Sequence, residues 1–536
     1  MKKTFIVYPF LFALYPVLGL YSRNLTEIQP WEVARPLVIA LLAAGLAMWL
    51  LNRLLKDRER SAFLAAFFVF FFSASELAYR VIEGYLIHGL GESFHRVILL
   101  IVTLMLAFLG SRAIWDKYMP PARRKLTADY LNLVSILVVL FPLYNIGAFW
   151  IKAADDAPRP WSSYVGANEQ PQSLAAGDTP DIYYIILDGY GRADALASLY
   201  GFDNSPFLDG LRDRGFYVAD QSQANYLRTS LSLTSALNME YINFTADLAG
   251  AESVNRIPMF ELASNNRARR LLEEAGYKFV LVDSGSAFTR FYDAEYFLTP
   301  FRSRPNLFEM WFYSTTALGA LYEPELPITP TLQEYLPVAG YATHREFILA
   351  GLDTLSTVPH IPGPKFVFAH IIAPHPPFVL DENGNPLHPN YPYVTGDGAS
   401  FVSNKDFYKQ GYIGQVEYLN GRVLAVVDDI LKKSARPPII ILQGDHGPGL
   451  LLLDGDTPES CLWERASILN AYYFPEDKTD LLYPSISPIN SFRTVFNAYF
   501  GASFDPLPDK TYFSLFEVPY NFIEITDTVR DECGVP

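Results

Sequence analysis

The stretch PPIIILQGDHGPG, residues 437–449, joins an apolar run directly to an Asp-His pair that lies between glycines. An Ile/Leu run bounded by proline and glycine predicts a strand buried on both faces, as in a parallel or mixed sheet covered by helices. Ligands of such sheets bind just beyond the carboxyl ends of the strands. Asp445 and His446 are therefore expected at a binding edge of the sheet.

Strands and helices alternate through the C-terminal two thirds of the chain. Strands are expected at residues 182–187, 278–282, 365–372 and 439–442, and helices near 205–214, after 229, and at 264–275, 407–433 and 490–500. In the longest of these helices apolar residues recur every three or four positions, the period of a face that packs against a core. The alternation predicts a layered α/β domain with a mixed central sheet. The Gly, Pro and Asn residues of 381–400 indicate a long loop that could cover a site.

The first 151 residues hold five apolar segments. They lie at 5–20, 36–51, 62–79, 97–109 with its flanks, and 130–151, and each approaches the roughly 20 residues that a membrane-spanning helix needs. The first is also compatible with a signal peptide, although it is long and more apolar segments follow it. The expected organisation is a five-helix transmembrane domain at 1–152, a linker at 153–180 rich in Ala, Pro, Ser and Gly, and an outer domain at 181–536.

Charge sets the expected orientation of these segments. Basic residues gather before the first apolar segment and in the loops at 53–60 and 112–125. The positive-inside bias then places the N-terminus in the cytoplasm, and five crossings place the residues after 151 outside. Of the total net charge of −15, residues 1–152 carry +7 and the remainder −22. An acidic outer domain of that charge argues against a nucleic-acid partner.

Cysteine is scarce in this chain. Cys461 and Cys533 are the only two, and both are expected outside the membrane, where they could form a disulfide. The sequence leaves their pairing open. It excludes a CxxC metal site.

Polar side chains follow several of the expected buried strands. Asp188 ends the strand at 182–187, although a lone Asp before a glycine is also typical of a helix cap or a turn. The adjacent Asp445 and His446 are a stronger signal, because a carboxylate and an imidazole side by side suit a divalent ion. His375 lies in the proline-rich turn PHPPF, and His370 is expected to be a buried, hydrogen-bonded histidine rather than a ligand.

Thr229 opens an expected helix, where free N–H groups and the helix dipole favour an anion such as phosphate. A threonine is a poor nucleophile unless its hydroxyl is activated, and ligation to a metal ion would lower the pKa of that hydroxyl. Thr229 is equally suited to be a plain helix cap. The neighbouring hydroxyls leave the choice of nucleophile open: Ser230, Ser232, Thr234 and Ser235.

The order of these motifs resembles the alkaline phosphatase and sulfatase superfamily. Asp188 after a strand, Thr229 with Ser232 three residues later, PHPPF and finally GDHG are similar to the membrane-anchored phosphoethanolamine and phosphoglycerol transferases, including the lipoteichoic acid synthases. Those relatives carry five transmembrane helices before an extracytoplasmic catalytic domain. The resemblance implies an alkaline-phosphatase-like (sulfatase-like) outer domain, held at a bacterial cytoplasmic membrane by several spans.

The resemblance also implies a set of site residues. One divalent ion, Mn, Zn or Mg, would be bound by Asp188, Thr229, Asp445 and His446. Thr229 would be the catalytic nucleophile, and His375 would contact the phosphate group. Three further residues are candidate substrate contacts: Asn225, Ser232 and Arg290. Asn225 and its neighbour Tyr226 suit a turn equally well, and Arg290 is alternatively a surface arginine.

Three departures from the superfamily pattern bear on which of its branches this chain resembles. Sulfatases need a Cys or Ser in a C/S-x-P-x-R context, and the stretch TSLSLTSA around Thr229 holds no Pro or Arg, which argues against a sulfatase. Asp188 stands where the transferases have Glu. The phosphoethanolamine branch typically carries several disulfides, which two cysteines cannot supply.

The resemblance implies a transfer in two steps. A head group of the phosphoglycerol or phosphoethanolamine type would pass from a membrane phospholipid to Thr229, and then from phospho-Thr229 to a glycan or lipid acceptor of the cell envelope. One alternative is an extracytoplasmic phosphodiesterase or phosphatase that uses the same residues with water as acceptor. A second alternative is an envelope scaffold without turnover.

Overall fold

The computed structural model divides the chain into two compact units. The helical unit comprises Met1–Asp155 and Phe301–Thr343, and the sheet unit comprises Asp156–Pro300 and His344–Pro536. The structure describes residues 5–86, 102, 105, 108–155, 160–167, 169–170, 173–175, 180–319, 334–335, 337–387, 393–398, 404–452 and 461–529.

A seven-stranded sheet forms the centre of the sheet unit, in the order β2-β7-β6-β1-β5-β3-β4. Its strands are β1 (Ile182–Leu187), β2 (Phe216–Val218), β3 (Lys278–Val282), β4 (Tyr296–Leu298), β5 (Lys365–Ile371), β6 (Ile439–Gln443) and β7 (Asn470–Tyr473). β1 pairs in parallel with β5 and β6, whereas β7 runs antiparallel to both of its neighbours. The sheet is therefore mixed, as the sequence predicts.

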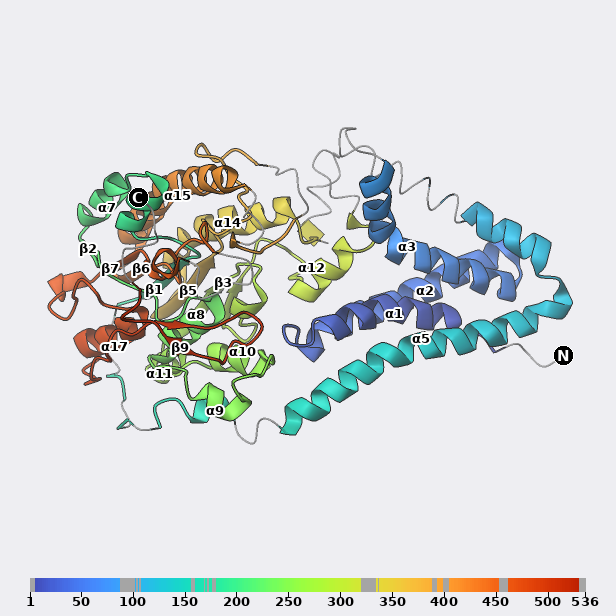
Figure 1. Ribbon diagram of the computed structural model, residues 1–536, viewed down its shortest axis with the longest axis horizontal. Helices are drawn as coiled ribbons and strands as arrows, with labels where there is room; N and C mark the ends of the chain where they lie inside the picture. The colour runs from blue at the N-terminus through green and yellow to red at the C-terminus, as the bar shows by residue number, and fades with distance from the viewer. Residues whose placement is uncertain are drawn as a thin grey trace. The chain divides into compact units, whose positions relative to one another are not determined.

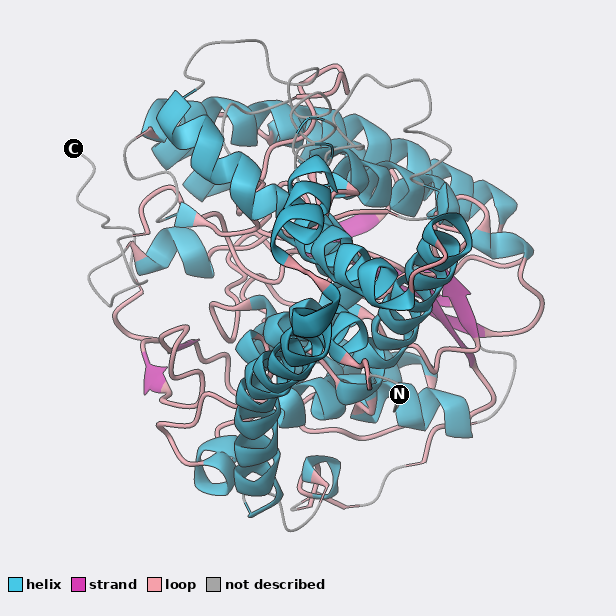
Figure 2. Ribbon diagram, turned by 90° about the vertical axis from the view of Figure 1, so that its right-hand side faces the viewer, coloured by secondary structure: helices cyan, strands magenta, loops and turns pink. Residues whose placement is uncertain are grey.

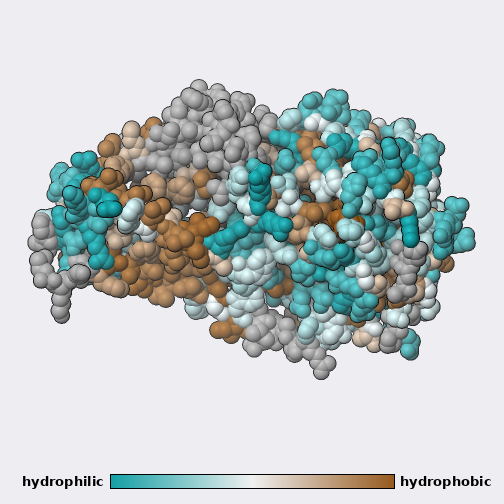
Figure 3. Space-filling view, turned by 180° about the vertical axis from the view of Figure 1, so that it is seen from behind, coloured by the Kyte–Doolittle hydropathy of each residue, from teal (hydrophilic) through white to brown (hydrophobic). Residues whose placement is uncertain are grey.

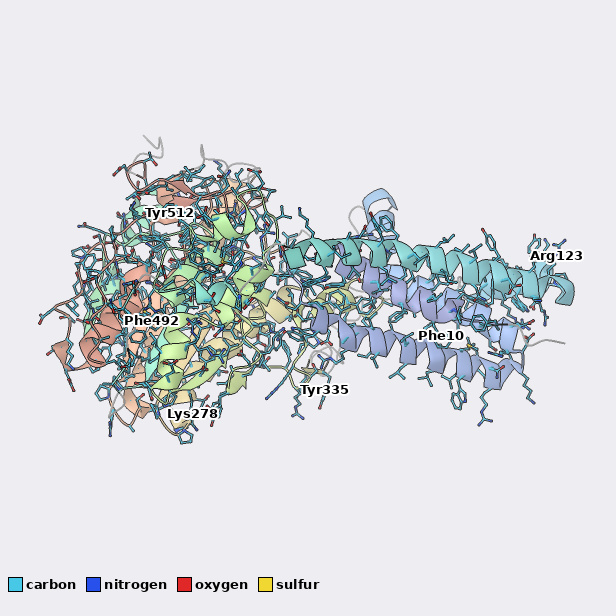
Figure 4. The ribbon with its side chains drawn as sticks, turned by 90° about the horizontal axis from the view of Figure 1, so that it is seen from below. Phe10, Arg123, Lys278, Tyr335, Phe492 and Tyr512 are labelled. Carbon is cyan, nitrogen blue, oxygen red and sulfur yellow. The ribbon has the colours of Figure 1, made fainter. Side chains whose placement is uncertain are left out.

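Helices cover both faces of this sheet (Figure 1). On one side lie α8 (Thr229–Asn238), α10 (Ile257–Ser264), α11 (Arg267–Glu274) and α17 (Pro488–Tyr499), and on the other α7 (Ser205–Arg212), α14 (Tyr341–Leu355) and α15 (Lys405–Lys433). Alternate residues of β1, such as Tyr184 and Ile186, join the core cluster that contains Phe492 of α17. The rings of Tyr184 and Phe492 meet edge to face at 5.2 Å, and Figure 4 labels Phe492 within this core. Cover on both sides explains why every residue of β1 is buried.

Most expected elements appear, with shifted ends. The helix predicted at 264–275 is two helices, α10 and α11, because the side chain of Asn266 accepts the backbone N–H of Arg269 and caps a new helix. The short strands β2, β4 and β7 were not expected, since three or four residues show no readable alternation. A separate two-stranded sheet joins β8 (Tyr512–Phe513) to β9 (Ile523–Glu524).

The described residues of the helical unit form helices and no strands (Figure 2). The N-terminal helices are α1 (Tyr8–Arg23), α2 (Ala34–Leu55), α3 (Arg58–Leu86) and α5 (Pro121–Asp155). Among the described residues, two stretches are long and apolar enough to cross a membrane, Pro30–Leu55 and Arg123–Lys152. α1 has 16 residues, and most of the expected span at 97–109 lies outside the described residues. The structure thus supports two of the five expected spans.

Large apolar side chains face outward on these two helices. Leu42 and Trp49 of α2 and Leu133 and Phe141 of α5 are all more than half exposed. The space-filling view shows a continuous hydrophobic surface over the helical unit (Figure 3). An apolar surface of this kind is costly in water and stable against lipid, which is consistent with a membrane-embedded unit.

One segment of the second half of the chain belongs to the helical unit. The expected outer domain ran without interruption from 181 to 536, whereas Phe301–Thr343 groups with the N-terminal helices. Phe308 and Phe312 of α12 (Leu307–Ser314) pack in a cluster with Val17 and Tyr21 of α1. Glu309, also in α12, is buried and forms an ion pair with Arg35. The apolar face of α12 finds its partners some 300 residues earlier in the chain, which no local pattern reveals.

The described part of the expected linker at 153–180 packs on the sheet unit. Trp161, in the 3-10 helix η2 (Trp161–Ser163), is 2% exposed and joins the main core. Glu169 forms ion pairs with Arg267, at 2.7 Å, and with Arg493. The segment is therefore anchored to the sheet unit and is more than a loose tether.

We predict that Glu169→Ala destabilises the protein by about 2 kcal/mol, because it leaves the buried guanidinium of Arg493 without its carboxylate. Unfolding of the detergent-purified full-length chain by denaturant measures this loss. Asp209→Ala is the control, since its ion pair with Arg212 is exposed on both sides and should change stability by less than about 0.5 kcal/mol. Equal losses in the two variants would contradict the anchoring role.

Candidate active site

The pairing of three parallel strands brings the candidate residues to one edge of the sheet. β1 is paired with β5 on one side and with β6 on the other, in a register that sets Leu187 opposite Ile371 and Ile186 opposite Gln443. Asp188 directly follows β1, and Asp445 lies two residues beyond β6. Because parallel strands end at the same edge, these side chains meet just past the carboxyl ends of the strands.

Asp188, Asp445 and His446 are three buried residues that could together hold a metal ion, each through one donor atom, and we call them the metal cluster. The three donor atoms lie within 4.8 Å of one another. His446 Nε2 is 3.6 Å from Asp188 Oδ1 and 3.4 Å from Asp445 Oδ2. His446 Nδ1 is 2.9 Å from the carbonyl oxygen of Gly447, to which it donates its proton. Nε2 is then the unprotonated nitrogen, and its lone pair faces the two carboxylates.

Two oxygens of the metal cluster lack a protein partner. Asp188 Oδ1 and Asp445 Oδ2 are buried and accept no hydrogen bond from the described residues. A buried carboxylate oxygen without a partner is costly, so such atoms generally indicate a ligand. Two carboxylate oxygens and one imidazole lone pair suit a divalent cation of the Zn or Mn type. The residues present therefore fit the metal ion that the sequence implies.

Thr229 lies beside the metal cluster, at the first position of α8. Its Oγ1 is 3.0 Å from His446 Nε2, and the residue is partly exposed, so a substrate can reach it. The neighbouring hydroxyls are engaged elsewhere, because Thr234 donates to the carbonyl of Ser230 and Ser235 to that of Glu240. These contacts separate Thr229 from Thr234 and Ser235, which the sequence could not tell apart from it.

Ser232 supports the site rather than lining it. Its Oγ donates a 2.7 Å hydrogen bond to the carbonyl oxygen of Asp445, and the residue is 1% exposed. The expected substrate contact of Ser232 is therefore corrected. Ser232, which is part of α8, holds the backbone of Asp445 in place.

The loop after β6 depends on glycine and on a buried carboxylate. A Cβ atom at Gly447 would lie 2.0 Å from the carbonyl oxygen of Glu464, so only glycine fits there. The Glu464 carboxylate accepts the backbone N–H groups of Leu450 and Leu451 and the hydroxyl of Tyr200. Burial raises the pKa of Glu464 to about 7. The Glu464 side chain thus fixes the backbone at Leu450 and Leu451, just after the GDHG motif.

His370 is buried and hydrogen-bonded, as predicted, and it orients Asp188. Its Nε2 is 3.1 Å from Asp188 Oδ2 and its Nδ1 is 3.0 Å from Thr289 Oγ1. The contact occupies one carboxylate oxygen and leaves Asp188 Oδ1 facing the metal cluster. Burial alone would raise the pKa of Asp188, but the charge of His375 and the hydrogen bond with His370 outweigh burial and hold this pKa well below its usual value.

His375 lies close to the metal cluster. Its backbone N–H donates to the carbonyl oxygen of Asp188 at 2.9 Å, and its ring centroid is 6.1 Å from that of His446. Burial alone would lower the pKa of His375, but the carboxylates of Asp188 and Asp397 outweigh it and raise this pKa. An imidazole of raised pKa this close to the metal cluster can donate a proton to an oxygen of a bound phosphate.

Sequence reasoning missed two charged residues of this site. Arg465, in α16 (Leu462–Ala466), places Nη2 3.1 Å from His446 Nε2 and Nη1 2.5 Å from Asp397 Oδ2. Asp397 lies in the loop that was expected to cover a site, so its position was signalled in part. Nothing in the local sequence marks Arg465. Burial alone would raise the pKa of Asp397, but Arg465 and His375 outweigh it and lower this pKa.

Two other expected substrate contacts belong to the core. Arg290 is neither a substrate contact nor a surface residue, since its guanidinium lies 2.6 Å from Asp283 and both side chains are fully buried. Asn225 donates to Ser487 Oγ and to the carbonyl oxygen of Lys510, and it accepts the N–H of Ile489. These contacts join the segment before Thr229 to the start of α17.

The segment before Thr229 also packs through aromatic rings. Tyr226 stacks on Tyr512, labelled in Figure 4, with ring centroids 5.5 Å apart. Tyr226 is fully buried and therefore shapes the core rather than a pocket. Cys461 is disulfide-bonded, and Cys533, the only other cysteine, lies outside the described residues.

The chain was compared with known proteins in three ways. No family model matches it, and no curated protein matches it. Solved structures similar to it include the C-terminal periplasmic domain of EcEptC from Escherichia coli in complex with Zn. That match has 15% identity and a TM-score of 0.40, and it covers 68% of this chain and 100% of that one.

A second similar structure is the integral membrane protein lipooligosaccharide phosphoethanolamine transferase A from Neisseria meningitidis. It has 12% identity and a TM-score of 0.37, and the match covers 92% of this chain and 95% of that one. A third is a 2-O GAG sulfatase, with 13% identity, a TM-score of 0.36, and coverage of 60% and 70%.

We predict that Asp188→Asn lowers the affinity of the purified protein for a divalent ion by at least about 100-fold, because it removes a charged donor from the metal cluster. His370→Leu should lower it by about 10- to 100-fold, since Asp188 loses the partner that orients it. Elemental analysis after equilibration in metal buffers measures both effects. His360→Gln, a change to an exposed histidine outside the site, is the control and should bind metal as the wild type does. Wild-type binding by Asp188→Asn would contradict the assignment.

Proposed function

We propose that this protein transfers a phospho-head group, of the phosphoglycerol or phosphoethanolamine type, from a membrane phospholipid to a glycan or lipid acceptor of the cell envelope. The observation that supports this function best is the position of Thr229. Its hydroxyl lies 3.0 Å from the lone pair of His446, next to two carboxylate oxygens that no described residue satisfies. A hydroxyl beside a cation site at a helix N-terminus is suited to attack phosphorus.

Asp188, Asp445 and His446 would hold one divalent ion, with the Thr229 oxygen as a further ligand. Bound there, an ion of the Mn, Zn or Mg type would lower the pKa of the hydroxyl and neutralise negative charge on the phosphate. Around that ion, the protein fixes the geometry through His370 on Asp188 and Ser232 on the backbone of Asp445.

The proposed transfer proceeds in two displacements at phosphorus. In the first, a bond forms between Thr229 Oγ1 and phosphorus while the bond from phosphorus to the diacylglycerol oxygen breaks. The Thr229 proton passes to solvent, and His375 donates a proton to the departing oxygen. In the second, the acceptor hydroxyl attacks phosphorus, the bond to Thr229 breaks, His375 takes up the proton of the acceptor, and the Thr229 oxygen regains a proton from solvent.

The apolar helices of the helical unit support a membrane phospholipid as the donor. Two of its helices are long and apolar enough to cross a membrane, and their outward surface is apolar. A chain embedded in a bilayer meets phospholipid at a far higher effective concentration than a soluble enzyme does. The sheet unit, with the site, would then lie on the extracytoplasmic side, as the distribution of basic residues indicates.

We predict that mass spectrometry of the wild-type protein, incubated with phospholipid and metal, finds an adduct on Thr229 whose mass identifies the donated group. Thr229→Ala should abolish both the adduct and turnover, whereas Thr229→Ser should retain measurable activity, because it keeps the hydroxyl at the first position of α8. An adduct on Ser230 or Ser232 instead would show that another hydroxyl is the nucleophile.

The fate of the head group separates transfer from hydrolysis. Labelled head group recovered on an envelope glycan or lipid would support the proposed transfer. Release of free head group alone, with the same Thr229 adduct, would show an extracytoplasmic hydrolase. A protein without bound metal, without an adduct, and with no loss in Thr229→Ala would leave only the scaffold.

A further inference from the structure

Arg465 is fixed by contacts on three sides. Its Nη1 donates to Asp397 Oδ2 and, at 2.9 Å, to the carbonyl oxygen of Gly447, and its Nε donates to the carbonyl oxygen of Leu227 at 3.2 Å. The residue is 7% exposed. Leu227 precedes the nucleophile by two residues, and Gly447 follows His446. The guanidinium therefore joins the two chain segments that carry the reactive groups.

The remaining end of the guanidinium is directed at the metal cluster. Arg465 Nη2 is 3.1 Å from His446 Nε2, which is itself 3.0 Å from Thr229 Oγ1, so Nη2 is at most about 6 Å from the nucleophile. A phosphorus atom in line for attack would lie roughly 3–3.5 Å from Oγ1, and its non-bridging oxygens would extend beyond it. An oxygen of the phosphate can thus fill the space between the two groups within hydrogen-bond distance of Nη2.

A positive charge at the position of Arg465 offsets the negative charges around the metal cluster. Asp188, Asp445 and Asp397 bring three carboxylates to the site, and a phosphate brings further negative charge. Arg465 carries a permanent positive charge there, since a guanidinium does not lose its proton in proteins. Its planar fork matches phosphate oxygens better than a lysine ammonium does.

Asp397 sets the direction of this fork. Its Oδ2 binds Arg465, while its Oδ1 accepts the hydroxyl of Tyr408 at 2.7 Å and the N–H of Gly398 at 2.8 Å. The same Tyr408 hydroxyl accepts the N–H of Gly449, in the loop after His446. Asp397 thus ties the Arg465 guanidinium, the start of α15 and the GDHG loop into one hydrogen-bonded network.

We propose that Arg465 is a catalytic residue that binds the non-bridging oxygens of the phosphate attacked by Thr229, and that Asp397 is its positioning residue. This inference rests on the proposed function. Arg465 remains protonated through both displacements, so it moves no proton and forms no bond. It stabilises the negative charge that builds on these oxygens as the bond to Thr229 forms and the bond to the leaving group breaks.

The test is the rate of adduct formation on Thr229 in the full-length, metal-loaded protein. Arg465→Lys keeps the charge but loses the fork, and we expect it to form the adduct about 100-fold more slowly. Asp397→Asn should slow it about 10-fold and reduce kcat more than it raises KM, because the guanidinium loses direction rather than charge. Metal content should stay at the wild-type level in both variants. Arg214→Lys, in an ion pair with Asp428 at the surface, is the matched control and should leave the rate unchanged.

Each outcome decides between a catalytic and a structural role. A normal rate of adduct formation in Arg465→Lys would overturn the inference. So would a rate that falls only in proportion to bound metal or to folded protein, as measured by elemental analysis and thermal unfolding of the same samples. If the wild-type protein forms no adduct, the proposed function itself fails. If the wild-type protein forms the adduct and Arg465→Lys forms it at the same rate, the inference alone fails.

Discussion

The parallel pairing of β1 with both β5 and β6 is the constraint on which the site depends. It ends three strands at one edge of the sheet and brings Asp188 and Asp445 close together, each with a buried oxygen that accepts no hydrogen bond from the described residues. Two carboxylates in such a position repel each other unless positive charge lies between or beside them. The strand pairing alone thus brings together the carboxylates of a candidate cation site.

The surroundings of the carboxylates supply part of that positive charge. His370 binds the outer oxygen of Asp188, the raised pKa of His375 favours its charged form, and Arg465 reaches the lone pair of His446. In the proposed transfer the same groups would contact the phosphate, and each is already held by a second contact, so little rearrangement would be needed on binding. The contacts that offset the charge of these carboxylates in the fold are thus the ones that the proposed phosphoryl transfer would use.

The two units divide the work of the protein. The sheet unit carries the candidate active site, and the helical unit presents an apolar surface that suits a bilayer. They are linked more than once along the chain, because Phe301–Thr343 leaves the sheet unit to pack α12 among the N-terminal helices. The ion pair of the buried Glu309 with Arg35 supports this packing, since a buried carboxylate is stable only opposite a partner.

The sequence by itself determined whatever depends on local periodicity and composition: the buried strands, the long helix α15, the mixed α/β layering, the apolar N-terminal segments, and the placement of Asp188, Asp445 and His446 at strand ends. Only the tertiary structure decided that Thr229 and not Ser232 faces the metal cluster, that Arg290 pairs with Asp283, and that Arg465 and Asp397 enter the site. The spacing of hydrophobic residues in the sequence shows which face of a single helix or strand is buried. These contacts instead join residues that lie tens to hundreds of positions apart. Their partners are set by how strands and helices pack, which leaves no mark on neighbouring residues.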